Sequence, residues 1–115
     1  MVRGRSRLDG TRCGPPRVPT EEAILARDRY ECQCPGCTSR RGLRAHYIVP
    51  LSEGGSDTPE NQVTLCAGHR SIIRDGHARV FGRAPDDLTW ELGIRPGRPP
   101  MRVYRGQKLI RSEID

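Results

Sequence analysis

The sequence predicts one small α+β domain that needs a staple beyond its hydrophobic core. The chain has 115 residues, the size of a single domain, and only 34% of them are hydrophobic and 4% aromatic. Short helical and strand-like segments are separated by turns rich in Gly and Pro. Four of the five cysteines and one histidine stand in two tight groups. Because the apolar content is low, cross-linking through these groups is expected to hold the fold together.

One helix and two strands are expected in the first half of the chain. Residues 1–19 combine Arg, Gly and Pro without periodicity, which predicts a basic disordered arm. Thr20 is the expected N-cap of a helix that ends near residue 29. Residues 30–37 are expected to form a strand that leads into a turn at Pro35-Gly36. Residues 43–49 are the best strand pattern in the chain.

Two helical segments, a hairpin and a tail are expected in the second half. Adjacent glycines in LSEGGSD predict a tight loop, and Thr58-Pro59 predicts the start of a helix that runs through residue 65. A further helical segment covers residues 69–74. Residues 78–82 and 88–92 predict a β-hairpin. Residues 93–115 are rich in Pro, Gly and Arg and are expected to be a basic C-terminal tail, which leaves residues 20–92 as the folded domain.

Positive charge is concentrated at both ends of the chain. The net charge is +6, and every basic residue except Lys108 is arginine. Residues 1–19 hold five Arg against one Asp, and residues 93–115 hold six basic residues against two acidic ones. Arginine-rich arms suit the phosphates of nucleic acid, whereas the alternative is solubility combined with an arginine-rich codon bias. The candidate nucleic-acid contacts are Arg3, Arg5, Arg7, Arg102 and Arg105 in the arms, together with Arg70 and Arg74 within the domain.

The cysteine groups predict a structural zinc site. Three cysteines lie in ECQCPGC, and LCAGH follows 28 residues after the third of them. Two short ligand pairs separated by a loop are typical of a tetrahedral zinc centre. The predicted ligands are Cys37, Cys66 and His69 together with either Cys32 or Cys34. Spacing alone leaves the first ligand open, since Cys34-x-x-Cys37 is the commoner arrangement.

No membrane or secretory segment is expected. The apolar runs are far shorter than the roughly 20 residues of a membrane span, and no signal-type apolar region follows the basic start. The odd cysteine count also argues for a reduced compartment. These features predict a cytoplasmic location and no membrane partner.

The segment RAHYIVPLSEGGSDTPENQVTLCAGH resembles the HNH endonuclease superfamily. It is similar to the family pattern of a paired His or Asp-His, then Pro, Leu, Gly-Gly, Asn and Leu-Cys. With the zinc pairs, the resemblance covers about residues 20–76, and the Cys-x-x-His pair is similar to one bacterial branch. It implies a small zinc-stapled ββα-metal domain, followed here by the C-terminal hairpin. It also makes Cys32 the favoured first zinc ligand over Cys34.

The resemblance implies a catalytic site that this sequence matches in part. In the family, the first residue of the strand pair binds a divalent ion such as Mg²⁺ or Mn²⁺, and the second is a histidine general base. His46 falls on the metal-ligand position and Asn61 on the position of an Asn that binds metal or holds the loop. Tyr47 stands where the base belongs. Arg70 replaces a later ligand, and Arg74 stands where many members have another His.

These replacements weaken metal-dependent chemistry. A phenol with a pKa near 10 is mostly protonated at pH 7, so Tyr47 is a poor general base. The fixed charge of Arg70 repels a cation, although a guanidinium can bind a phosphate directly. His77, just beyond the predicted helix end, can replace the missing ligand only if that end bends back.

Each candidate also has a structural explanation. His46 can be a partly buried strand histidine, Asn61 can satisfy loop amides, and Tyr47 can pack its ring with its hydroxyl in water. Arg70 and Arg74 can form a solvated helix face. Two functions therefore stay open. One is a metal-dependent DNA endonuclease with a weakened catalytic set, and the other is an inactive HNH-derived zinc module that binds DNA or RNA. The oligomeric state is left open.

Overall fold

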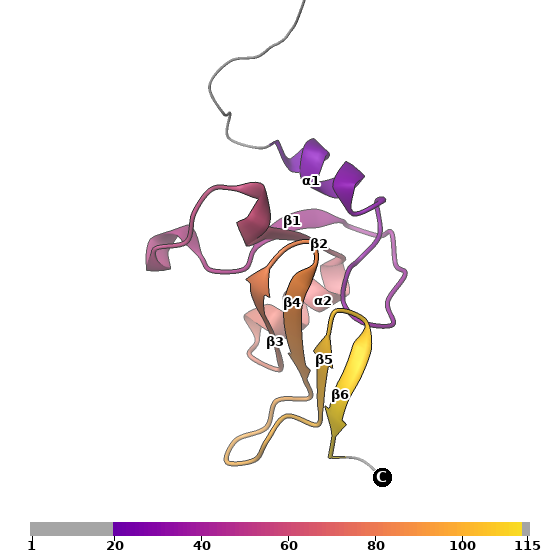
Figure 1. Cartoon of the computed structure of the whole chain (residues 1–115), viewed down its shortest axis with the longest axis vertical. Helices are drawn as coiled ribbons and strands as arrows, with labels where there is room; N and C mark the ends of the chain where they lie inside the picture. The colour runs from indigo at the N-terminus through magenta and orange to yellow at the C-terminus, as the bar shows by residue number, and fades with distance from the viewer. Residues whose placement is uncertain (1–19, 114–115) are drawn as a thin grey trace, which may run out of the picture.

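Two α-helices and two antiparallel sheets form the part of the chain that the computed structural model describes, residues 20–113 (Figure 1). The elements follow the order α1 (Glu21–Arg27), β1 (Arg44–Tyr47), the short 3₁₀ turns η2 (Leu51–Glu53) and η3 (Pro59–Asn61), β2 (Gln62–Leu65), α2 (Ala67–Arg74), β3 (Ala78–Arg83), β4 (Asp87–Leu92), β5 (Arg102–Arg105) and β6 (Lys108–Ser112). The prediction of a small α+β domain is confirmed. No helix among these residues has the length and apolar character to cross a membrane.

α1 begins as the sequence predicts and packs on the small sheet. The Thr20 hydroxyl accepts a hydrogen bond from the Ala23 amide at 3.1 Å, which satisfies one of the open donors at the helix start. Glu21 and Glu22 lie in the first turn, where the helix dipole favours negative charge. Ile24 is buried, and α1 contacts both β1 and β2.

β1, β2 and α2 form a continuous ββα unit. The two strands pair antiparallel, with Arg44 opposite Leu65 and His46 opposite Val63. α2 follows β2 after a single residue, Cys66, which is the N-cap of the helix. The order strand, loop, strand, helix is the one that the family resemblance implies.

Two of the expected elements are wrong. Residues 30–37 form turns, not a strand, because Arg29 and Tyr30 adopt left-handed backbone conformations and reverse the chain directly after α1. The helix expected over residues 59–65 is a single 3₁₀ turn followed by β2. All four residues of β2 are buried, so the strand shows no polar alternation that would distinguish it from a helix.

The second sheet is larger than the predicted hairpin. β3 and β4 form that hairpin, but β5 and β6 extend it to a four-stranded sheet in the order β3-β4-β5-β6. Residues 93–113, expected to be a basic tail, therefore contribute two strands. The turn between β5 and β6 also holds the cysteine-rich loop, because Gln107 accepts from the Gly36 amide at 3.1 Å and donates to the Gln33 carbonyl at 3.1 Å.

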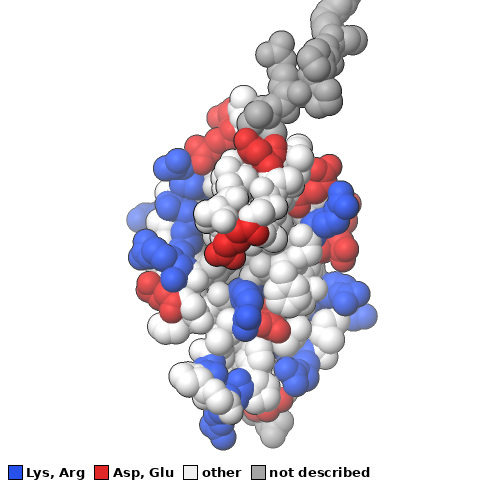
Figure 2. All heavy atoms as spheres, turned by 90° about the vertical axis from the view of Figure 1, so that its left-hand side faces the viewer, with Lys and Arg blue, Asp and Glu red and all other residues white. Residues whose placement is uncertain are grey.

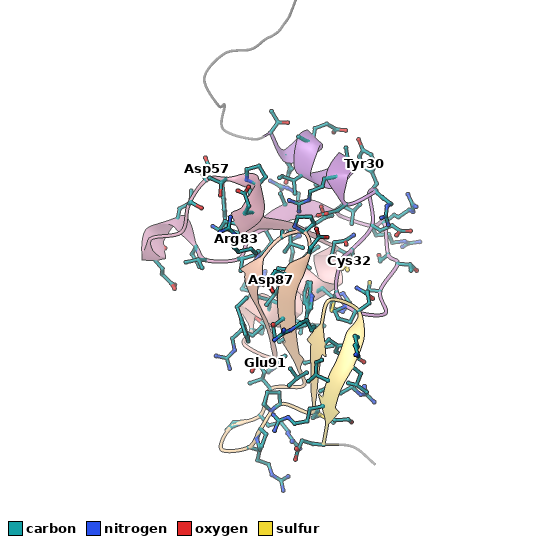
Figure 3. The ribbon with its side chains drawn as sticks, in the orientation of Figure 1. Tyr30, Cys32, Asp57, Arg83, Asp87 and Glu91 are labelled. Atoms are coloured by element: carbon teal, nitrogen blue, oxygen red, sulfur yellow. The ribbon has the colours of Figure 1, made fainter. Side chains whose placement is uncertain are left out.

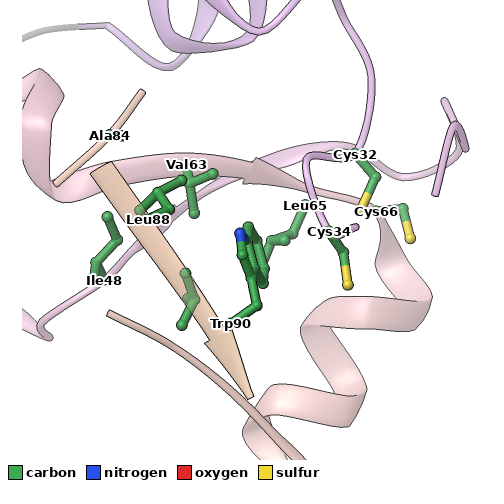
Figure 4. Close-up of a cluster of buried hydrophobic side chains, with 10 residues drawn as sticks. Cys32, Cys34, Ile48, Val63, Leu65, Cys66, Ala84, Leu88 and Trp90 are labelled. Atoms are coloured by element: carbon green, nitrogen blue, oxygen red, sulfur yellow. The ribbon is translucent and has the colours of Figure 1, made fainter. Parts of the chain in front are cut away.

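The core lies between the ββα unit and the inner face of this sheet (Figure 4). Trp90 from β4 is 1% exposed and packs with Val63 and Leu65 from β2. The same cluster includes Cys32, Cys34 and Cys66. The cysteine-rich loop is thus continuous with the hydrophobic core.

A buried carboxylate joins α1 to β2. Asp28, which follows α1, accepts hydrogen bonds from the Arg27 guanidinium at 2.9 Å and from the Thr64 amide at 2.9 Å. Arg27 also donates to the carbonyls of Pro59 and Gln62, at 2.8 and 2.6 Å. Because Asp28 is only 5% exposed, its removal leaves the Thr64 amide without an acceptor and the Arg27 guanidinium without its carboxylate.

Asp28→Ala is therefore expected to destabilise the domain by about 2–4 kcal/mol, since it breaks a buried, hydrogen-bonded ion pair. Urea denaturation followed by circular dichroism measures this change. The matched control is Glu31→Ala, which removes the exposed ion pair with Arg40 at 3.1 Å and is expected to change stability by about 0.5 kcal/mol. Equal effects of the two substitutions would contradict the structural role of Asp28.

Candidate functional site

Four side chains converge to form a group that can hold a metal ion. Their ligand atoms, from Cys32, Cys37, Cys66 and His69, all lie within 4.8 Å of one another. The imidazole Nδ1 of His69 lies 3.5 Å from the sulfur of Cys32 and 3.4 Å from that of Cys66. Two ligands come from the loop after α1 and two from the junction of β2 and α2. The prediction that the two short ligand groups meet across the fold is therefore confirmed.

The group fits zinc in ligand type, and the two distances to the His69 nitrogen fit it in size. Three thiols and one imidazole are a common donor set for structural zinc. With zinc–ligand bonds of roughly 2.0–2.3 Å, the edges of the tetrahedron are about 3.4–3.8 Å. The two sulfur–nitrogen distances, 3.5 and 3.4 Å, lie in that range. The residues present are therefore consistent with a zinc centre.

Backbone amides support the sulfur atoms. The Ser39 amide donates to the Cys37 sulfur at 3.5 Å, and the His69 amide donates to the Cys66 sulfur at 3.5 Å. Burial alone would raise the pKa of the Cys66 thiol, but hydrogen bonds from the His69 backbone and ring outweigh it and lower the pKa to about 6. A thiol that ionises readily is a better metal ligand.

Cys34 is a buried core residue and lies outside the metal-binding group. Its side chain is 2% exposed and packs in the cluster that contains Trp90. Burial raises the pKa of the Cys34 thiol to about 12, and it raises the pKa of Cys32 equally, so position and not acidity distinguishes the two thiols. Of the two alternatives that the spacing left open, the geometry selects Cys32, which Figure 3 labels in the cysteine-rich loop.

His46 lies under the electrostatic influence of Arg70. Partial burial lowers the pKa of the imidazole, and the positive charge of Arg70 lowers it further. Arg70 itself donates to the Gly42 carbonyl at 2.8 Å, while its Nε is buried without a partner among the described residues. Any cation on His46 would therefore be repelled by a fixed guanidinium.

The side chain of Asn61 holds the loop between β1 and β2. Its carbonyl oxygen accepts from the Val49 amide at 2.9 Å. Its amide group donates to the carbonyls of Val49 at 2.9 Å and Ser56 at 2.8 Å. Gly55 lies so close to Val49 that a Cβ there would lie 1.9 Å from the Val49 carbonyl oxygen, which explains the glycine. Both donors and one acceptor position of Asn61 are therefore used in the loop.

Tyr47, at the general-base position, is paired with an acid. Its hydroxyl donates to Asp57 at 2.7 Å, and this hydrogen bond, more than burial, raises the pKa of the phenol. A raised pKa makes proton abstraction by Tyr47 at neutral pH still less favourable. The partner Asp57 was not singled out from the sequence, because nothing in the loop pattern shows which strand residue it faces.

The residues present do not fit a catalytic divalent ion at His46. Arg70 supplies charge of the wrong sign, Asn61 is engaged elsewhere, and Tyr47 is bonded to Asp57. Over residues 20–113, the Cys32–His69 group is the one cluster of three or more His, Cys, Asp or Glu side chains that is suited to a metal. His77, considered as a substitute ligand, has an exposed side chain. Its backbone amide donates to the Ile72 carbonyl, and its carbonyl accepts from the Ile94 amide.

The predicted nucleic-acid contacts are distributed over separate elements. Arg74 lies in the last turn of α2, where its guanidinium donates to Ser71 at 2.8 Å. Arg102 and Arg105 belong to β5. The predicted contacts Arg3, Arg5 and Arg7 lie outside the described residues.

A pocket of about 380 Å³ lies where the loop before β2 meets the end of β3. It is lined by Ser56, Thr58, Glu60, Asn61, Gly82 and Arg83. Figure 3 shows Arg83 close below the loop that carries Asp57. Sequence reasoning missed Arg83, since only the folded chain brings the hairpin to the loop.

Comparison with protein-family models matches residues 32–68 to the HNH endonuclease family. The matched segment includes β1, β2 and three of the four metal-binding residues, and it ends just before His69 and Arg70. No curated protein and no solved structure shows a significant match. The match confirms the resemblance to the HNH superfamily, a family of nucleases whose members interact with nucleic acid.

The metal-binding group gives a direct test of ligand identity. Cys32→Ser is expected to abolish tight zinc binding, whereas Cys34→Ala should retain about one equivalent of zinc because the Cys34 thiol is a packing group. Zinc content after gel filtration, measured by atomic emission, distinguishes the two. Loss of zinc from Cys34→Ala with retention in Cys32→Ser would reverse the assignment.

Complete removal of zinc by a chelator is expected to unfold the domain, because the core alone is small. Cooperative melting that persisted afterwards would show that the metal is dispensable.

The loop around Asn61 gives a second test. Asn61→Ala removes three hydrogen bonds and is expected to lower the free energy of unfolding by about 2–3 kcal/mol. It should also make residues 49–58 more sensitive to protease. Ser56→Ala is the matched control, because Ser56 contributes its backbone carbonyl to Asn61 and keeps it. If Asn61→Ala were as stable as this control, the loop-holding role would be refuted.

Proposed function

We propose that this protein is an HNH-derived, zinc-stapled module that binds DNA without cleaving it. The observation that carries this proposal is the guanidinium of Arg70, whose charge acts on His46 at the position where active members of the family bind a metal ion. Fixed positive charge disfavours a divalent cation but favours a phosphate. Arginine at position 70 thus removes a condition for metal-dependent cleavage and favours the binding of phosphate.

Arg70 is suited to this role by its position. It lies in α2 and is anchored by one hydrogen bond to the Gly42 carbonyl, so its side chain is held in place. Arg74 is one turn further along the same helix, and Arg44 lies on β1 in an ion pair with Glu21 at 2.7 Å. A phosphate bound at Arg70 would replace water around a preorganised guanidinium, which reduces the loss of side-chain entropy on binding.

In this proposal the group Cys32, Cys37, Cys66 and His69 holds a structural zinc ion. The ion would fix the cysteine-rich loop to the start of α2, and so fix Arg70, the residue after His69. Zinc has no part in bond cleavage here, since all four of its coordination positions are filled by protein.

A metal-dependent DNA endonuclease is the second candidate. The match of residues 32–68 to the HNH endonuclease family favours it, together with His46 at the first ligand position. For this function, Arg70 would have to bind the scissile phosphate, and another group would have to activate water. Neither Tyr47, whose pKa is raised, nor Asn61 supplies that group.

The test combines a binding assay with a cleavage assay. Zinc-loaded protein is incubated with supercoiled plasmid and Mg²⁺, Mn²⁺ or no added metal. We expect plasmid that is retarded on the gel but uncut under all conditions, with binding weakened about tenfold in Arg70→Gln through loss of a phosphate contact. Arg40→Gln, which removes an exposed arginine outside α2, is the control for a general loss of charge.

Cleavage that depends on added metal and disappears in His46→Ala would overturn the proposal and favour the endonuclease. A further arm tests the explanation for inactivity. The double variant Tyr47→His, Arg70→His restores the family's side chains at both positions and is expected to gain metal-dependent nicking that the wild type lacks.

A further inference from the structure

The outer face of the four-stranded sheet is a basic surface outside the HNH segment. Residues that are opposite each other on paired strands share one face. Two rows of side chains cross the sheet on the side away from the core. The first row consists of Arg79, Glu91, Val103 and Arg111, and the second consists of Phe81, Thr89, Arg105 and Lys108. The opposite face carries Val80, Trp90 and Tyr104, which pack in the core.

Charge on this outer face is predominantly positive. Arg83 at the end of β3 adds to Arg79, Arg105, Lys108 and Arg111, and the acidic residues of the face are Asp87 and Glu91. Figure 3 labels Arg83, Asp87 and Glu91 along the sheet. Figure 2, which views the molecule from the side of β3, shows more basic than acidic side chains over the lower half, where the sheet lies.

Three of these cations are available to a ligand. Glu91 is paired with Arg79 at 3.2 Å, and Glu113 lies 3.9 Å from Arg111. Over residues 20–113, the side chains of Arg83, Arg105 and Lys108 have no such partner and are exposed. Unpaired surface cations raise the local positive potential and attract polyanions.

An exposed aromatic ring lies among them. Phe81, the single phenylalanine of the chain, is 41% exposed and alternates on the outer face of β3 with Arg79 and Arg83. Phe81 is also in the row that leads to Arg105 and Lys108. Cations that follow a phosphate backbone, combined with a ring on which a base can stack, are typical of surfaces that bind single-stranded nucleic acid.

The surface is continuous with the HNH loop. Arg83 belongs both to the outer face and to the pocket that Ser56, Thr58 and Asn61 line. The Glu60 carbonyl accepts from the Ala84 amide at 2.8 Å, which fixes the end of β3 against the loop. A single-stranded nucleic acid on the sheet would therefore meet the loop at Arg83, where the pocket also contains the acidic Glu60.

We infer that the outer face of the β3-β4-β5-β6 sheet is a second nucleic-acid site, which binds a single strand by stacking a base on Phe81 and holding phosphates with Arg83, Arg105 and Lys108. The inference rests on the proposed function for the class of partner, nucleic acid, and adds the site and the single-stranded form.

The test measures fluorescence anisotropy of labelled oligo-dT and of an oligo-dT·dA duplex with the full zinc-loaded chain. Phe81→Ala and Arg105→Glu are each expected to weaken oligo-dT binding about tenfold, the effect of losing one base stack or one phosphate contact. Arg105→Gln should reduce the slope of log affinity against log salt by about 0.7. Arg98→Glu, an equal charge reversal in the loop between β4 and β5, is the matched control and should change affinity less than twofold. Zinc content and melting curves establish that each variant is folded.

The outcomes separate this inference from the proposed function. If the wild type binds oligo-dT and the affinities of Phe81→Ala and Arg105→Glu equal that of Arg98→Glu, the sheet site is overturned. The proposed function of the HNH-derived module is not affected by that result. Tighter binding of the duplex than of oligo-dT, with no effect of Phe81→Ala, would overturn the single-strand assignment. If the wild type bound neither probe, both the proposed function and the inference would fail.

Discussion

The convergence of Cys32, Cys37, Cys66 and His69 is the constraint on which the rest of the structure depends. Cys66 directly follows β2, caps α2 and belongs to the hydrophobic core. A single residue thus connects the strand, the helix and the metal-binding group. The loop after α1 has no regular secondary structure, and it is held by backbone hydrogen bonds such as that from the Gln33 amide to the Thr64 carbonyl. In a chain of 115 residues with 34% hydrophobic content, a metal ion bound at this group would add stability that burial alone does not supply.

The ββα unit carries a fixed positive charge beside His46. A metal-dependent nuclease uses a bound cation to stabilise negative charge on the phosphate. In the proposed function the guanidinium of Arg70 supplies positive charge instead, so phosphate binding would not depend on a metal ion. The Asn61 bonds to Val49 and Ser56 hold the loop between β1 and β2. The residue that orders this loop is therefore a different one from the residue that supplies positive charge near His46.

How far the sequence predicts the structure depends on how local each signal is. The cap of α1, the strand containing His46 and the hairpin of β3 and β4 follow from short-range patterns, and the structure contains them. The cysteine spacing predicts the four-ligand group but leaves the first ligand open between Cys32 and Cys34, because the deciding factor is which sulfur lies near His69.

The sequence pattern of β2 predicts a helix wrongly, because α1 covers one face of the strand and the core covers the other, so that both faces are buried. β5 and β6 were mistaken for a tail, because their residues are largely exposed and rich in arginine. The partnership of Tyr47 with Asp57 and the position of Arg83 against the loop are tertiary, and no local pattern carries them.

Gln107 connects the two ends of the described chain. Its hydrogen bonds to Gly36 and Gln33 span 71 and 74 residues of sequence. Contacts of such separation form late in folding, because the loop that they close has a large entropy. During translation, the ββα unit, which ends at Arg74, has been synthesised completely before Gln107 is added. The order of synthesis therefore favours a pathway in which the cysteine-rich loop is organised first and the last hairpin closes over it as the final step.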